Sequence, residues 1–256
     1  MRMLLLALQL PLLFFALFAA ADDRPVITLA ADDWCPYNCD QGADRQGYVV
    51  ELVRELFDQS EYRVVYQNMP WARALQLLEA GQITAAIGVT HDELPTAVFP
   101  DEPIGYFQGH FLLPSHSDWH YSGPESLGNM RLGVINGYDY GEFNQVIDQL
   151  RGSDRLMELS GDDAINRGLG MLARGRIDAF LEDRDVARYT VSQLGLRDKV
   201  RSGDSVGQPV VLYLAFSQQH PTAEKHAQQW STGIRLLRAS GRLAEILSTY
   251  GVEDWQ

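Results

Sequence analysis

The sequence is poor in cysteine and in positive charge. Its 256 residues include two cysteines, and 21 Lys and Arg residues stand against 34 Asp and Glu, so the formal net charge at pH 7 is −13. Nucleic acids and anionic lipid surfaces bind clustered basic side chains, and we therefore expect neither as a partner. The charge is compatible with a cationic ligand but does not require one.

Long apolar runs are scarce as well, and only the first residues, "MRMLLLALQLPLLFFALFAAADD", contain one. One Arg, an apolar stretch and small residues follow one another there, which is the layout of a secretory signal peptide with Ala19 to Ala21 as the cleavage site. An uncleaved membrane anchor is the alternative, but Pro11 interrupts the run and no positive cluster follows it. We expect residues 1–21 to be removed and the remaining chain to be exported.

Motifs of several enzyme classes are absent or out of context. No Gly-rich phosphate-binding motif is present, so ATP hydrolysis would belong to another subunit. "GDSVG" (203–207) has the spacing of a serine hydrolase motif, but a polar segment precedes it and Pro209 follows it, so we expect a turn. His116 and His120 lie in a loop-like stretch without the Glu of a zinc protease. We expect no catalytic activity, no cofactor and no bound metal.

Both cysteines lie in the stretch "DDWCPYNCDQG" (32–42). The spacing of Cys35 and Cys39 is C-x3-C rather than the C-x-x-C of thiol oxidoreductases, and two further zinc ligands are lacking nearby. Neighbouring thiols of an exported protein tend to pair. We expect a small structural disulfide, with free thiols as the alternative.

The apolar pattern alternates between strand and helix periodicity, which is typical of an α/β sheet protein. The expected strands are residues 26–31, 62–69, 83–89, 106–113, 130–137, 155–160, 176–183 and 209–221, and the expected helices are 47–60, 70–81, 140–152, 163–175 and one or two within 223–251. The segments "LQLLEAGQITAAIGV" (75–89) and "LGMLARGRIDAFLED" (169–183) share a helix end, a Gly stop and a strand of small residues. This echo indicates two lobes of similar build.

Ligands of open α/β sheets gather beyond the carboxyl ends of the strands. The residues found there, strand by strand, are Trp34, Tyr37, Trp71, Gly88, Thr90, Asn136, Tyr138 and Asp183. The aromatic rings of Trp34, Tyr37 and Trp71 suit an apolar or cationic ligand body, although core packing is the alternative. Free backbone N–H groups at a helix start after Asn136 would suit an anionic group such as a carboxylate.

The order of several segments carries a family resemblance. They are "WCPY", "GYVVELVRELF", "PWARALQLLEAGQITAAIGVT", "LGNMRLGVINGY", "MLARGRIDAFLEDRDVARY", "PVVLYLAFSQQHP" and "LRASGRLAEILSTYG". The chain after the leader resembles the family 3 extracellular solute-binding proteins of the polar amino acid type, which serve ABC importers. The resemblance implies a monomer in the periplasm that captures a small polar solute and delivers it to permease subunits in the inner membrane.

The resemblance also implies an α/β fold of the two-lobed type II periplasmic binding protein kind. Each lobe would be a βαβ-built sheet flanked by helices. Lobe 1 would comprise residues 22–112 and 211–256, and lobe 2 residues 113–210. Two extended crossings, near "HFLLPS" and "LYLAFS", would form the hinge that closes the lobes over the ligand.

One position departs from the family pattern. Similar amino acid binders carry an Arg that holds the α-carboxylate of the ligand, and the corresponding residue here is Glu93. Either Arg73 or Arg184 takes over this role, or the ligand is not an ordinary α-amino acid. The resemblance further implies that Asp183 pairs with the ligand's ammonium group, with a helix N-cap as its alternative role. Together, Glu93, Asp139, Glu182 and Asp183 favour a cationic ligand.

Two alternative functions share this scaffold. A few relatives dehydrate small cyclic acids in the cleft, and His91 and Glu93 at its rim keep such an enzyme under consideration. A ligand sensor that docks on a membrane receptor is the other alternative.

Overall fold

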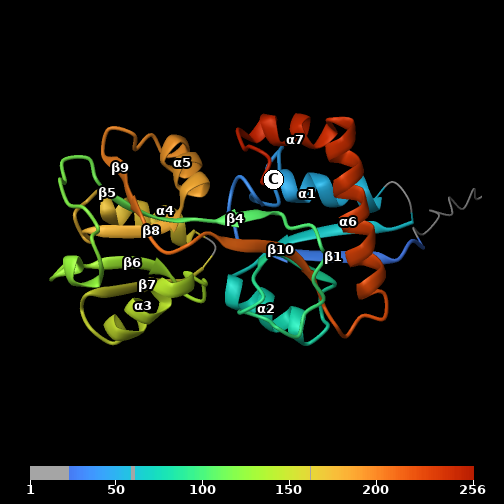
Figure 1. The fold of residues 1–256 in the computed structure, drawn as a ribbon, viewed down its shortest axis with the longest axis horizontal. Coiled ribbons are helices and arrows are strands. Elements are labelled where there is room, and N and C mark those ends of the chain that lie inside the picture. Colours follow the sequence, from blue (N-terminus) through green and yellow to red (C-terminus); the bar gives the residue numbers. More distant parts are fainter. Residues whose placement is uncertain (1–22, 59–60, 162) are drawn as a thin grey trace, which may run out of the picture.

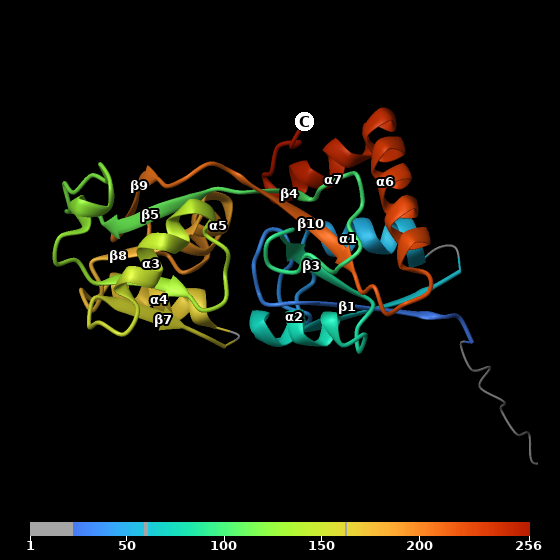
Figure 2. The ribbon, with the colours of Figure 1, turned by 60° about the horizontal axis from the view of Figure 1, so that its bottom comes forward.

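The computed structural model describes residues 23–58, 61–161 and 163–256 (Figure 1). The expected signal peptide, residues 1–21, lies outside them. No helix of the described residues has both the length and the apolar character needed to cross a membrane. The chain forms two α/β lobes that lie side by side, and two extended segments pass between them along one side of the molecule (Figure 2).

Lobe 1 contains a five-stranded sheet in the order β2-β1-β3-β10-β4. Strands β1 to β3 are parallel, and β10 runs antiparallel to both of its neighbours. Helices α1, α6 and α7 cover one face of this sheet and α2 the other (Figure 1). The elements of lobe 1 are β1 (Val26–Ala31), α1 (Tyr48–Val53), the π-helical continuation η1 (Arg54–Asp58), β2 (Arg63–Asn68), α2 (Trp71–Glu79), β3 (Ala85–Val89), β4 (Gly105–Phe107), β10 (Val210–Phe216), α6 (Ala223–Ser240) and α7 (Arg242–Tyr250).

Lobe 2 contains a second five-stranded sheet in the order β7-β6-β8-β5-β9. Strands β6, β7 and β8 are parallel, and β5 runs antiparallel to β8 and β9. The elements of lobe 2 are β5 (Gly109–Pro114), η2 (Pro124–Leu127), β6 (Leu132–Ile135), η3 (Gly141–Phe143), α3 (Asn144–Leu150), β7 (Leu156–Leu159), α4 (Ala164–Leu172), β8 (Ala179–Asp183), α5 (Arg184–Gln193) and β9 (Val200–Ser205).

The echo between residues 75–89 and 169–183 corresponds to equivalent pieces of the two lobes. Strands β3 and β8 occupy the third place of their sheets, and each follows a helix, α2 or α4. Gly81 and Gly175 follow the ends of these helices with φ of 71° and 67°, a conformation that favours glycine. The predicted two-lobed α/β fold is confirmed.

The crossings between the lobes lie close to the expected segments but not at the expected residues. Residues 106–113 form two strands, β4 of lobe 1 and β5 of lobe 2, and the chain changes sheet at Gln108. The expected boundary at residue 112 therefore falls inside β5. The chain returns to lobe 1 between Ser205 and Val210.

The expected turn at 203–207 is wrong in its first part, because Gly203 to Ser205 belong to β9. This edge strand is polar and lacks the apolar alternation of a buried strand. Asp204 is instead satisfied by a neighbouring loop, since its Oδ2 accepts the backbone N–H of Tyr121 at 2.9 Å and lies 3.2 Å from Nδ1 of His120.

Candidate ligand-binding site

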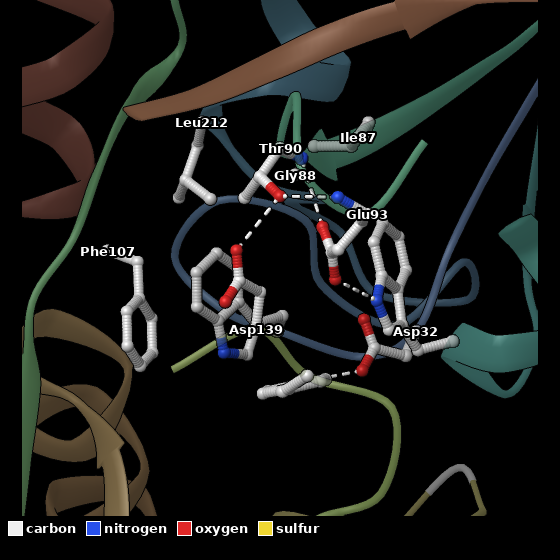
Figure 3. A pocket seen from close by; sticks show the side chains of 11 residues that line it. Asp32, Ile87, Gly88, Thr90, Glu93, Phe107, Asp139 and Leu212 are labelled. Atoms are coloured by element: carbon white, nitrogen blue, oxygen red, sulfur yellow. Dashed lines mark hydrogen bonds between the residues drawn. The ribbon is translucent and has the colours of Figure 1, made fainter. Parts of the chain in front are cut away.

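A cavity lies between the two lobes, where the ends of β1, β3 and β6 meet, as the strand-end rule predicts. Lobe 1 contributes the loop after β1, the start of α2, and β3 with its following loop. It also contributes strands β4 and β10, which lead into the crossings between the lobes. Lobe 2 contributes the loop after β6. The lining residues are Asp32, Trp34, Trp71, Ile87, Gly88, Thr90, Glu93, Phe107, Tyr138, Asp139 and Leu212 (Figure 3).

The lobes are closed on one another. The cavity volume is about 30 Å³, which is room for about two water molecules. Arg188 of α5 donates across the lobes to the carbonyl oxygen of Gly251 at 2.8 Å. Among the described residues, three hydrogen bonds between two side chains also join the lobes, and in each one a carboxyl group of one lobe accepts from the other lobe. They are Tyr138 OH to Asp32 Oδ2 at 2.5 Å, Thr90 Oγ1 to Asp139 Oδ2 at 3.1 Å, and Trp34 Nε1 to Glu182 Oε1 at 2.9 Å.

Glu93 is fixed in the cavity wall by two donors of its own lobe. Its Oε1 accepts from Trp71 Nε1, and its Oε2 accepts from the backbone N–H of Thr90, both at 2.9 Å (Figure 3). Burial raises the pKa of Glu93 to about 7, although these hydrogen bonds favour the charged form. The position where the family resemblance expects a cationic Arg therefore holds a half-buried carboxyl group.

The aromatic wall is built on the loop after β1. Trp34 stacks on Tyr37 with ring centroids 4.4 Å apart, and Tyr138 of lobe 2 meets Trp34 edge to face at 6.1 Å. The expected disulfide between Cys35 and Cys39 closes this loop. Tyr37 does not itself line the cavity, since it lies behind Trp34 and donates its hydroxyl proton to the carbonyl oxygen of Tyr106 at 2.9 Å.

Asp183 lies outside this cavity and caps a helix. Its Oδ1 accepts the N–H groups of Asp185 and Val186 at the start of α5, and its Oδ2 accepts the N–H of Gln108 at 3.0 Å. Burial raises its pKa to about 6. Of the two roles expected for Asp183, the structure shows the N-cap, and the acidic group that meets the aromatic wall is its neighbour Glu182.

The arginines proposed as replacements do not reach the cavity lining. Arg73 is exposed on α2, and Arg184 is exposed on α5, with its Nε 3.6 Å from Asp185 Oδ1. Asn136 lines an adjoining cavity that shares Glu93 and Tyr138 with the first. Six of the ten predicted ligand-binding residues, Trp34, Trp71, Gly88, Thr90, Glu93 and Tyr138, line the cavity between the lobes.

The expected anion site after Asn136 is wrong. Helix α3 starts only at Asn144, after the short 3₁₀ turn η3. The backbone N–H of Asn136 donates to Leu159 O, and that of Gly141 donates to Asp139 Oδ1 at 2.8 Å, so these amides already have partners. The prediction failed because the polar residues after β6 resemble the start of a helix in the sequence.

Asp32 was not selected from the sequence, although it precedes Trp34 by two residues in the opening loop. Its carboxyl group points toward the same space as those of Glu93 and Asp139 (Figure 3). The order of strand ends gave no sign of it, because the loop after β1 contains several acids and only its folded path decides which one faces the cleft.

Comparison with known protein families identifies the family of this chain. Residues 26–253 match the model of the bacterial extracellular solute-binding proteins, family 3. The chain belongs to this family. A comparison of this family 3 protein with curated protein sequences finds no match.

Solved structures show the same fold. The substrate-binding protein of an ABC uptake transporter from Streptococcus pneumoniae with bound histidine is 17% identical, covers 90% of this chain and 94% of its own, and has a TM-score of 0.75. The arginine-, lysine-, histidine-binding protein ArtJ from Geobacillus stearothermophilus is 14% identical, with 89% and 95% covered and a TM-score of 0.72. A histidine kinase sensor domain is 17% identical, with 90% and 98% covered and a TM-score of 0.74.

Proposed function

We propose that this family 3 protein captures a small organic cation without a carboxylate group in the cleft between its lobes. The single observation that carries this proposal is the charge of the cavity. Three of its lining residues, Asp32, Glu93 and Asp139, are acidic, and none of the described residues that line it is Lys or Arg.

An ammonium or guanidinium group would offset the negative charge of these acids. Half-buried carboxyl groups around one cavity repel one another when ionised, and a cationic donor between the lobes reduces that repulsion and donates further hydrogen bonds. The faces of Trp34 and Trp71 add cation–π attraction. The cavity of about 30 Å³ is too small for an organic cation, so the lobes must part to admit one. Because Asp139 belongs to lobe 2 and the other two acids to lobe 1, a cation between them draws both lobes toward itself.

An ordinary α-amino acid fits this cleft less well. The carboxylate of the amino acid would lie beside Asp32, Glu93 and Asp139, and like charges that lie close together repel one another. None of the expected holders of that carboxylate lines the cavity. Glu93 takes the place of the Arg, Arg73 and Arg184 are exposed, and the amides of Asn136 and Gly141 are already used within the chain.

A thermal-shift screen tests this proposal with matched pairs, each an amino acid and the amine left after loss of its carboxyl group: arginine and agmatine, lysine and cadaverine, histidine and histamine. A ligand that binds the folded state raises Tm by mass action. We expect a larger rise with the amine of at least one pair. Equal or larger shifts with the amino acids throughout would contradict the proposal.

Delivery to an ABC importer in the periplasm is part of the same proposal, and family membership supports it. The ligand sensor is the alternative, and the likeness to a sensor domain keeps it under test. Uptake of a labelled amine that depends on this protein and on a permease supports import, whereas a signal without uptake supports sensing. We also propose that no turnover occurs, which chromatography of the ligand after incubation with the protein checks directly.

A further inference from the structure

Glu182 is a fully buried acid with half of its carboxyl group unsatisfied. It lies in β8 of lobe 2 and is 0% exposed. Its Oε1 accepts from Trp34 Nε1 of lobe 1 at 2.9 Å and from the backbone N–H of Asp183 at 2.8 Å. Its Oε2 is buried and has no hydrogen-bond partner among the described residues. Burial favours the neutral acid at this position, although both N–H donors favour the carboxylate.

The groups that face Glu182 do not neutralise its charge. Asp32 from the loop after β1 and Asp183 beside it are acidic, and their charges disfavour a third one. His110 lies opposite Glu182 in the β5–β8 ladder, and burial lowers its pKa, which disfavours a positive charge on this ring. The remaining titratable neighbours are the phenols Tyr138 and Tyr140, whose pKa values burial raises well above the usual range.

The hydrogen bond to Trp34 ties this buried state to the closed lobes. Trp34 and Glu182 belong to different lobes, so opening the cleft separates them and lets water reach the carboxyl group. A carboxyl group in water has an ordinary pKa, whereas burial in the closed form raises the pKa of Glu182 to about 8. Closure of the lobes therefore takes up a proton at pH values between the ordinary carboxyl pKa and about 8.

We propose that Glu182 is a positioning residue that couples lobe closure to a proton: its neutral form tolerates burial against Trp34 in the closed cleft, and its ionisation favours the open cleft, where water reaches the carboxylate. The closed-form pKa lies above the open-form pKa, so this contribution to closure is complete below the ordinary carboxyl pKa and is lost as pH rises through about 8. The inference rests on the hinged lobes of the proposed function but on none of its ligand chemistry.

Small-angle X-ray scattering of the ligand-free protein between pH 6 and 9 tests this coupling. We expect the radius of gyration of the unmodified protein to increase as pH passes about 8, with an unchanged far-UV circular dichroism spectrum. Glu182→Gln keeps the shape and the acceptor oxygen but cannot ionise, so it should stay compact throughout. Glu224→Gln, at an exposed position of α6, is the matched control and should follow the unmodified protein.

Two further variants distinguish the effect of Glu182 on lobe opening from the effects of the other acids in the cleft. Glu93→Gln should retain the increase near pH 8, since it leaves Glu182 unchanged. Asp32→Asn removes a charge that raises the pKa of Glu182, so the increase should move to lower pH. A radius of gyration that is constant from pH 6 to 9, or the same increase in Glu182→Gln, would overturn the inference. Failure of every amine to bind would contradict the proposed function but not the role of Glu182, because the scattering experiment uses the ligand-free protein.

Discussion

The indole N–H of Trp71 donates a 2.9 Å hydrogen bond to Oε1 of Glu93. Trp71 is the first residue of α2, directly after Pro70, and Glu93 follows β3, so two separate elements place an aromatic ring and a carboxyl group side by side. A ring face and an adjacent negative charge are the two features that attract an organic cation. This pair is therefore the core of the proposed site.

Replacing Glu93 by Gln should weaken amine binding about 10- to 100-fold, because a hydrogen bond to a charged group contributes about 1.5–3 kcal/mol. The amide keeps the size of the side chain, so the fold should survive. Titration calorimetry gives the two dissociation constants, with Glu224→Gln as the control that changes net charge equally. Equal affinities of Glu93→Gln and the unmodified protein would remove Glu93 from the site.

Trp71 should contribute through its ring more than through its N–H group. Trp71→Phe keeps an aromatic face and loses the donor to Glu93, whereas Trp71→Ala loses both. We expect Trp71→Ala to weaken amine binding about tenfold, in line with a cation–π contribution of about 1–2 kcal/mol, and Trp71→Phe to weaken it less. Since Trp71 is buried, Trp71→Ala should also lower Tm. Identical affinities of the Phe and Ala variants would contradict a role for the ring.

Amine affinity should rise with pH between about 6 and 7.5. The pKa of Glu93 is raised to about 7 in the ligand-free protein, and a bound cation favours its charged form, so binding releases a proton in this range. Calorimetry in two buffers of different ionisation enthalpy measures that release. Glu93→Gln should show less release and a flatter pH profile. Proton uptake in a Glu182→Gln background, where lobe closure takes up no proton, would give the wrong sign.

Loss of the Cys35–Cys39 disulfide should affect both stability and binding. The closed loop is short, so the free energy of unfolding should fall by only about 2 kcal/mol in the double Ser variant. The same loop holds Trp34 against Tyr37, so we also expect weaker amine binding at a temperature where the variant is fully folded. Denaturant unfolding and calorimetry measure the two effects separately, and an unchanged affinity would limit the disulfide to stability.

Most of the fold could be predicted from the sequence because its helices and buried strands carry strong apolar periodicity. Strand β1 was predicted with its observed bounds, and the echo of residues 75–89 in 169–183 matches the equivalent positions of β3 and β8. Strand β9 was missed because it is a polar edge strand. The break at Gln108 was missed because one continuous extended segment serves both sheets.

Part of the candidate site could be predicted from the order of the strands and helices. The rule for strand ends found Trp34, Thr90 and Tyr138 because it depends only on the order of the elements. It did not distinguish Glu182 from Asp183, because successive side chains of a strand point to opposite faces and the sequence does not fix which one contacts Trp34.

The most direct test of the central claim is titration calorimetry at pH 7.5 with the matched pair that gives the largest thermal shift. The described residues that line the cavity offer carboxylates to an ammonium or guanidinium group and no Lys or Arg to a carboxylate. We therefore predict that the amine binds at least tenfold more tightly than its parent amino acid. Tighter binding of the amino acid would contradict the account.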